Sequence, residues 1–318
     1  MITALFLISG LMLLYFGAEW LVKGSANLAL RAGVSSLVVG LTIVAFGTSA
    51  PELVVSIGAG MKGLGDISVG NVVGSNIFNI AVILGISALL RPLKINAQLF
   101  RVDLSVMIAV SLLLWLLLLD SAIGRIEAAF LAAAVILYIG LTVYLGSRKA
   151  PPSTAAEGQK EAQKKRAGER PVFLEIGLIA LGLAALVAGS RFFVKGAVEL
   201  AQHLGISEAV IGLTIVAAGT SLPELATSIF AAVKGEEDIA VGNIIGSNIF
   251  NILAILGITG MFAPLSSPGI KAVDMAFMAG TAVVLLPFMR TGFRLSRIEG
   301  ILLLAIYVGY LWYLWPGN

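Results

Sequence analysis

Two short stretches of this 318-residue chain place a glutamate inside apolar sequence that is long enough to cross a membrane. Residues 47–53 read GTSAPEL, and residues 219–225, 172 positions later, read GTSLPEL. In both, the proline lacks a backbone N–H and the preceding glycine and hydroxyl residues loosen the helix, so main-chain carbonyls lose their helical donors. A carboxylate beside free carbonyl and hydroxyl oxygens is the ligand chemistry of a hard cation such as Ca²⁺.

Each stretch also belongs to a polar stripe, because hydroxyl, carboxyl and amide residues recur every fourth position and therefore share one helix face. The stripes are Thr48, Glu52 and Ser56; Asn71, Ser75 and Asn79; and their copies Thr220, Glu224, Ser228, Asn243, Ser247 and Asn251. Glycines with small-xxx-small spacing at 70 and 74, and at 242 and 246, would let these helices approach closely. Asp66 and Asp238, where the second helix of each copy begins, are predicted to be N-caps.

The two glutamates need a positive partner, since an ionised carboxylate near the bilayer centre costs several kcal/mol when uncompensated. No Lys or Arg lies at comparable depth in these four segments, which points to a mobile cation. Calcium fits such a cluster better than Mg²⁺, which demands strict octahedral geometry, and the absence of Cys and of intramembrane His argues against zinc or copper. The alternative is a structural polar pair that holds helices together.

The elements that carry these residues are predicted to be transmembrane helices. With 58% hydrophobic and 12% charged residues, the composition is that of a multi-spanning membrane protein, and strand-type alternation is absent. The net charge of +3 does not suggest nucleic acid. The predicted spans cover residues 2–22, 36–60, 68–90, 100–119, 126–146, 172–195, 207–233, 240–262, 272–290 and 297–315.

These spans form an all-α integral membrane protein with ten transmembrane helices in two five-helix halves, 1–146 and 172–318, joined by a polar linker at 147–171. A repeat with an odd number of helices enters the membrane from opposite sides in its two copies, so the halves should be inverted repeats. Sixteen Lys and Arg lie on the linker's side and five on the other. We therefore expect a cell-membrane protein with a cytoplasmic linker and both termini outside.

The two pairs of stretches, GTSAPEL with GNVVGSNIFN and GTSLPEL with GNIIGSNIFN, closely resemble the two alpha repeats of the sodium/calcium exchanger branch of the cation/calcium antiporter superfamily. The resemblance covers four helices at residue level and six by count, order and linker position. It implies ten helices around a central ion site, and antiport of sodium against calcium by alternating access, with calcium extruded. It further implies a transporter rather than an enzyme, no cofactor, Ca²⁺ and Na⁺ as transported ions, the lipid bilayer as surroundings and a monomer as the working unit.

The resemblance also implies a set of ion ligands. They are Glu52 and Glu224, the hydroxyls of Thr48, Ser49, Thr220 and Ser221, the main-chain oxygens of Ala45 and Ala217, and Ser75, Ser247, Asn79 and Asn251 from the second motifs. Some family members, including potassium-dependent ones, carry aspartate at the position of Asn251, so two formal charges here make potassium co-transport less favoured. The proton-coupled branch typically has a glutamate soon after the GN of its second motif, where this chain reads Gly-Ser-Asn. A proton-coupled or other-cation antiporter and a passive cation channel are the alternatives.

Overall fold

The computed structural model describes residues 2–148, 171–204 and 217–314. Its long helices are α1 (Ile2–Ala32), α7 (Leu104–Leu117), α8 (Arg125–Arg148), α10 (Val172–His203), α16 (Ala272–Arg290) and α17 (Arg297–Leu314). The first half adds α2 (Ser36–Val39), η1 (Gly40–Val44), α3 (Ala45–Thr48), α4 (Ala50–Met61), α5 (Gly65–Phe78), η2 (Asn79–Leu84), α6 (Gly85–Leu90), η3 (Leu99–Asp103) and η4 (Leu118–Asp120). The second half adds α12 (Ala217–Gly219), α13 (Leu222–Lys234), α14 (Glu237–Phe250), η6 (Asn251–Leu256), α15 (Gly257–Phe262) and η7 (Thr291–Phe293).

Membrane-length helices account for most of this chain. In the described ranges, eight helices are long and apolar enough to span a bilayer, and a ninth span consists of residues 36–48 and 50–61, bent by 46° at the break between them. These nine match nine of the predicted spans. The predicted span at 207–233 lies partly outside the described residues, as does nearly all of the linker at 147–171, so the count of ten helices stays a prediction.

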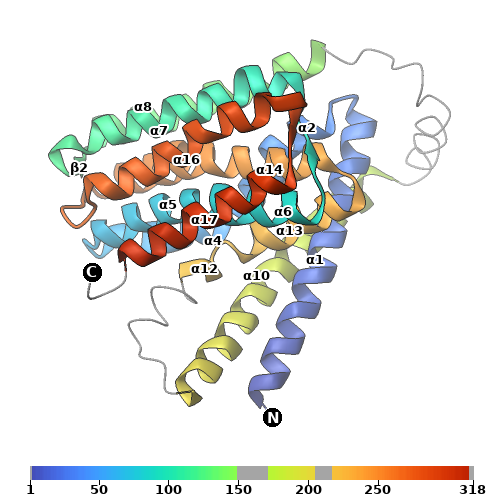
Figure 1. Ribbon diagram of the computed structural model, residues 1–318, viewed down its shortest axis with the longest axis horizontal. Coiled ribbons are helices and arrows are strands. Elements are labelled where there is room, and N and C mark those ends of the chain that lie inside the picture. The colour runs from blue at the N-terminus through green and yellow to red at the C-terminus, as the bar shows by residue number, and fades with distance from the viewer. Residues whose placement is uncertain (1, 149–170, 205–216, 315–318) are drawn as a thin grey trace.

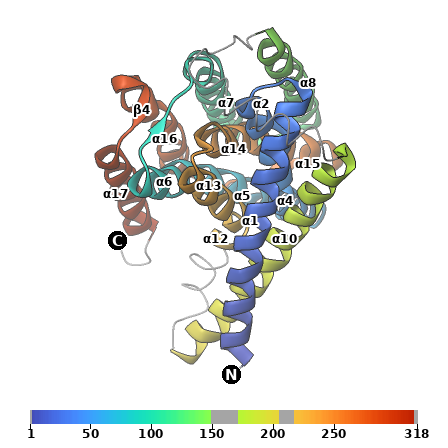
Figure 2. The same cartoon turned by 90° about the vertical axis from the view of Figure 1, so that its right-hand side faces the viewer.

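Two helices are longer than predicted: α1 continues to Ala32 and α10 to His203. The predicted span of α1 ends before Lys23, because a charged residue lowers the local hydropathy. The helix itself continues past Lys23, because its backbone hydrogen bonds continue and α10 lies alongside. Figures 1 and 2 both show α1 and α10 side by side. The N-terminal end of α1 and the C-terminal end of α10 project together beyond the other helices.

α1 and α10 pack antiparallel along a seam of glycines spaced seven residues apart. The seam consists of Gly10, Gly17 and Gly24 in α1 and Gly182, Gly189 and Gly196 in α10. A Cβ at Gly10 would lie 2.6 Å from the backbone nitrogen of Phe193, and one at Gly182 would lie 2.7 Å from that of Leu21. Only glycine permits backbones to approach this closely. The equivalent first helices of the two halves therefore run in opposite directions, as inverted repeats require.

Short strands join the halves at the ends of the helices, where the sequence showed no strand pattern. β1 (Leu93–Lys94) pairs antiparallel with β4 (Arg294–Leu295), and β2 (Ala122–Ile123) with β3 (Leu265–Ser266). β1 and β3 are equivalent strands, 172 residues apart, and so are β2 and β4. The two pairings are therefore the same contact, formed once with each half supplying the first partner. Two-residue strands are too short to leave an alternation in the sequence, which is why they were not predicted.

The N-cap prediction for Asp66 and Asp238 is wrong. Helix α5 is capped at Leu64 and α14 at Glu236, in both cases without a side-chain cap hydrogen bond. Asp66 instead accepts a hydrogen bond of 2.7 Å from the backbone N–H of Gly269, in the other half of the chain. The Asp66 carboxylate therefore forms a tertiary hydrogen bond and not the helix cap that its position in the sequence suggested.

The helices that carry the second motifs form the centre of the molecule. In α14 with η6 and α15, every residue of the most apolar 18-residue window is buried, whereas only 17% of the corresponding window of α17 is buried. In the first half, 78% of the corresponding window of α5 with η2 and α6 is buried. Both second motifs thus lie inside the protein, and the outer helices form the perimeter (Figure 2).

Candidate ion-binding site

Both GTS-x-PEL stretches are breaks between helices. In the first, α3 ends at Thr48 and α4 begins at Ala50, with Ser49 between them. In the second, α12 ends at Gly219 and α13 begins at Leu222. Each proline lies in the first turn of the new helix, where its missing N–H costs nothing and its fixed φ is compatible with the helix. The predicted breaks are confirmed, and each places its glutamate in the first turn of the helix that follows.

The two breaks meet through crossed hydrogen bonds. Ser49 Oγ donates to Glu224 Oε1 at 3.0 Å, and Ser221 Oγ donates to Glu52 Oε1 at 3.1 Å. Both glutamates are fully buried. Since the serine of each break binds the carboxylate of the other, the two carboxylates are held at one centre although they lie 172 residues apart in the sequence.

The second motifs supply amides and hydroxyls to the same centre. Ser75 Oγ accepts a hydrogen bond of 3.3 Å from Ser221, and Ser247 Oγ donates at 3.5 Å to the carbonyl of Ala45. Asn79 and Asn251 are buried at the first residue of the π-helical segments η2 and η6. A π-helical turn leaves a main-chain carbonyl without its usual partner and occurs frequently at functional sites.

Asn71 and Asn243, the first residues of the second-motif stripes, form hydrogen bonds between helices. Asn71 Nδ2 donates to Ser56 Oγ at 3.1 Å and to the carbonyl of Glu52 at 3.3 Å. Asn243 Nδ2 donates to Ser228 Oγ at 2.9 Å, and its Oδ1 accepts from Thr48 at 3.1 Å. Their amide nitrogens support the glutamate-bearing helices, which favours a structural role for both.

Several polar atoms at this centre are buried without a hydrogen-bond partner in the part of the chain that the structure describes. They are one oxygen of each glutamate (Glu52 Oε2 and Glu224 Oε2), both side-chain polar atoms of Asn79, Oδ1 of Asn248 and Asn251, and the hydroxyl of Thr220. An unpaired buried polar atom costs about 1–3 kcal/mol, and buried polar groups are normally satisfied. A group of unpaired oxygens around two carboxylates has the ligand chemistry to hold cations.

The predicted ligands are thus mostly brought together. Thr48, Ser49, Ser75, Ser221 and Ser247 are buried with the glutamates and both asparagines. The carbonyl of Ala45 accepts from Thr48 as well as Ser247. Thr220 is half-buried and lines a cavity, and Ala217 begins α12, so its main-chain oxygen lies one turn before Ser221. Within the described ranges no three His, Cys, Asp or Glu residues lie together, so further ligands would be hydroxyls, amides and carbonyls.

Two asparagines were missed by the sequence reasoning. Asn76 Nδ2 donates to the carbonyl of Asn248 at 3.2 Å, and Asn76 Oδ1 accepts from Asn251 Nδ2 at 2.9 Å. These bonds join the second motifs of the two halves. The sequence did contain a signal for Asn76 and Asn248, because Ser-Asn-Ile-Phe-Asn occurs unchanged in both copies. They were not selected because they do not lie at the four-residue spacing of the polar stripes.

We expect Ser221→Ala to weaken the apparent affinity for the transported cation by about tenfold or more, since a hydrogen bond to a charged group is worth roughly 1.5–3 kcal/mol. The change frees Glu52 Oε1 from the donor that orients it and removes the bond to Ser75. The measurement is the half-saturating cation concentration for transport. Ser111→Ala is the matched control, because that buried serine donates to the carbonyl of Met107 within its own helix. An unchanged value for Ser221→Ala would contradict the crossed hydrogen bond as an orienting contact.

Membrane-length helices around a buried two-carboxylate centre define the class of this protein as a multi-pass membrane transporter. A family model described as "Sodium/calcium exchanger protein" matches residues 2–145 and 174–315. The chain therefore belongs to the sodium/calcium exchanger family, whose members are cation/calcium antiporters and not enzymes.

The chain is also similar to individual proteins over most of its length. The chain is 35% identical to the sodium/calcium exchanger MaX1 of Methanosarcina acetivorans, with 98% of each chain covered. It is 40% identical to the inner membrane protein YrbG of Escherichia coli, over 81% of this chain and 79% of that protein. The solved structure of the sodium-calcium exchanger NCX_Mj soaked with zero Na⁺ and Ca²⁺ matches with a TM-score of 0.84 at 33% identity, covering 99% of both chains.

Proposed function

We propose that this protein exchanges sodium for calcium across the cell membrane by alternating access, and that it extrudes calcium. The observation that carries the proposal is the pair of crossed hydrogen bonds between the breaks, Ser49 with Glu224 and Ser221 with Glu52, beside buried oxygens that have no partner among the described residues. Two carboxylates can balance one Ca²⁺ or two Na⁺, so the same ligands serve both ions in turn.

The proposed ligands are those that the resemblance implies. Glu52 and Glu224 supply the charge, and the hydroxyls, the amides of Asn79 and Asn251 and the carbonyls of Ala45 and Ala217 complete the coordination. A site that takes either ion but not both couples their movements, because the protein changes its facing state only when the two carboxylates are compensated. If three Na⁺ enter for each Ca²⁺ expelled, one net charge moves inward, and the membrane potential contributes about 2.3 kcal/mol per 100 mV to calcium export.

The proposed topology places the linker at 147–171 in the cytoplasm and both termini outside, with ten spans in two inverted halves, and the monomer is the proposed working unit. The antiparallel packing of α1 against α10 supports the inversion, and the excess of Lys and Arg on the linker's side supports the orientation.

The relatives bear on the choice of coupling ion. MaX1 is named a sodium/calcium exchanger, and the matched structure is of a sodium-calcium exchanger. Both second motifs of this chain read Gly-Ser-Asn without an acidic residue, which also favours sodium over protons. Proton-coupled calcium antiport is the second candidate on the same site.

The test is calcium uptake into proteoliposomes loaded with sodium, compared with potassium-loaded and proton-loaded vesicles, with the membrane potential clamped by an ionophore. Sodium-coupled antiport predicts uptake only with internal sodium. Uptake driven by a pH gradient without sodium would move the protein to the proton-coupled candidate. Uptake in the absence of any counter-ion would indicate a passive channel.

A further inference from the structure

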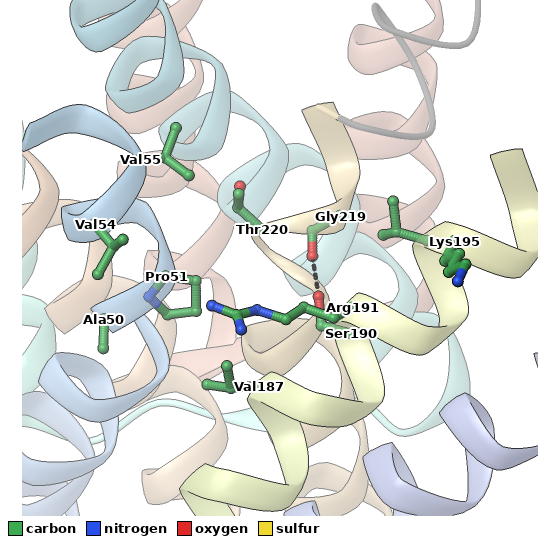
Figure 3. Close-up of a pocket in the computed structure, with 11 residues that line it drawn as sticks. Ala50, Pro51, Val54, Val55, Val187, Ser190, Arg191, Lys195, Gly219 and Thr220 are labelled. Carbon is green, nitrogen blue, oxygen red and sulfur yellow. Dashed lines mark hydrogen bonds between the residues drawn. The ribbon is translucent and has the colours of Figure 1, made fainter. Parts of the chain in front are cut away.

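A cavity of about 440 Å³ lies between α10 and the two breaks, and Arg191 extends into it (Figure 3). Its floor contains Ala50 and Pro51 from the first break and Gly219 and Thr220 from the second. The Ser190 hydroxyl donates to the carbonyl of Gly219 at 2.5 Å and ties α10 to this floor. The cavity is therefore in contact with both breaks and with Thr220, whose hydroxyl has no partner among the described residues.

The wall that α10 contributes is one face of that helix. Val187, Ser190, Arg191, Val194 and Lys195 follow the i, i+3, i+4, i+7, i+8 spacing, and all line the cavity. The bond from Ser190 to Gly219 fixes this part of α10 at the depth of the second break. Arg191 is the next residue, and its guanidinium extends toward Pro51, whereas the side chain of Lys195, one turn farther along α10, lies away from Pro51 (Figure 3). A guanidinium at that depth is costly unless it faces water, and such residues mark ion pathways.

Arg191 has no neutralising neighbour in the described part of the chain. Ion pairs found there include Lys23 with Glu19 and Arg91 with Glu237. The duplication shows how unusual this is: Arg191 is the equivalent of Glu19, and Lys195 is the equivalent of Lys23. In the first half these positions form an ion pair with a 2.5 Å contact, whereas in the second half both positions are positive. Arg191 is therefore a positive charge that has no counterpart in the first half, where the equivalent residue is Glu19.

We propose that Arg191 is a valence filter on the ion pathway of one membrane face, a conclusion that rests on the proposed sodium-calcium exchange. A fixed positive charge raises the energy of a nearby cation in proportion to the cation's charge. The factor by which the fixed charge lowers the local concentration of Ca²⁺ is therefore the square of the factor for Na⁺. The filter admits Na⁺ from this face with a small loss and suppresses the rebinding of released Ca²⁺. A lipid phosphate would lie at the headgroup level rather than at the depth of the breaks, which favours the pathway over a lipid site.

The test is Arg191→Gln, with Arg191→Lys as the charge-preserving variant and Lys195→Gln as the control one turn away. Half-saturating Na⁺ and Ca²⁺ are measured in inside-out and right-side-out vesicles from the same cells. Arg191→Gln should lower the value for Na⁺ by about threefold and that for Ca²⁺ by about tenfold, on one face only. Arg191→Lys should change neither, and Lys195→Gln should have a smaller effect.

Several results would overturn the filter. Equal factors for Na⁺ and Ca²⁺ would indicate a steric effect, and equal changes on both faces would indicate an altered central site. An effect of Lys195→Gln as large as that of Arg191→Gln, and present only with anionic lipid, would assign the cavity to a lipid. If the wild-type protein shows no sodium-dependent calcium transport, the proposed function fails and the filter with it. If the wild type exchanges and Arg191→Gln behaves like it, only the filter fails.

Discussion

Replacing Glu52 or Glu224 by glutamine is expected to reduce calcium exchange at least 100-fold while leaving the protein folded in the membrane. Glutamine keeps the volume of the side chain and can still accept the serine hydrogen bond, but it removes one of two charges that compensate the cation. Removing one partner of a buried charge pair costs about 3–5 kcal/mol, which corresponds to a loss of about 100-fold or more. The measurement is sodium-dependent calcium uptake by purified protein in liposomes.

Thermal unfolding separates this interpretation from the structural alternative, in which the glutamates only hold helices together. A ligand that binds the folded state stabilises it by an amount that grows with its concentration, about 2.7 kcal/mol at 100 times Kd. The glutamine variants should therefore unfold near the wild-type temperature without calcium, and they should lose the calcium-induced rise in Tm. Structural polar pairing predicts the reverse: a lowered Tm without calcium and an intact response to it.

Glu127→Gln is the matched control for both measurements. Glu127 lies in the first turn of α8 and accepts a hydrogen bond from the backbone N–H of Gly124, a role that the amide oxygen of glutamine can fill. Exchange and the calcium response should both be unchanged. Normal exchange in Glu52→Gln or Glu224→Gln would sink the site assignment, since no other carboxylate joins this centre in the described residues.

The centre was predictable because the duplication repeats it. One proline-glutamate break in an apolar segment is ambiguous, but two at a constant offset, each followed by the same asparagine-serine stripe, predict that both serve one site. The sequence does not show which residues of the two halves come into contact. The crossing of Ser49 to Glu224 rather than to its own Glu52, and the join between Asn76 and Asn251, arise from packing between segments about 175 residues apart.

Some backbone features could be predicted from the sequence and others could not. Pro51 predicts the first break, since proline cannot donate a backbone hydrogen bond within a helix. The π-helical starts at Asn79 and Asn251 have no sequence signal, because each lies inside an apolar run that reads as ordinary helix. Asp66 was misassigned for a related reason: its local position fits a cap, but Gly269 of the other half donates to it.

Gly182→Ala is expected to destabilise the protein by about 1–3 kcal/mol, the usual cost of overpacking. Its Cβ would lie 2.7 Å from the backbone nitrogen of Leu21 and 2.8 Å from the carbonyl of Gly17, and backbone cannot give way as a side-chain end can. The two helices must separate, and α10 would carry Ser190 away from Gly219 at the second break. We therefore expect a lower Tm together with a severalfold loss of exchange.

Gly177→Ala is the matched control because it lies on the same helix, carries the same substitution and has no atom within 4 Å of the added Cβ. Alanine also favours helix over glycine by about 1 kcal/mol, so this variant should keep full exchange with an equal or higher Tm. The pair separates helix propensity, which both changes improve, from the contact at the seam, which only Gly182→Ala disturbs. If both variants gain stability alike, α1 and α10 do not approach as closely as the glycine seam requires, and their coupling to the second break through Ser190 would have to be abandoned.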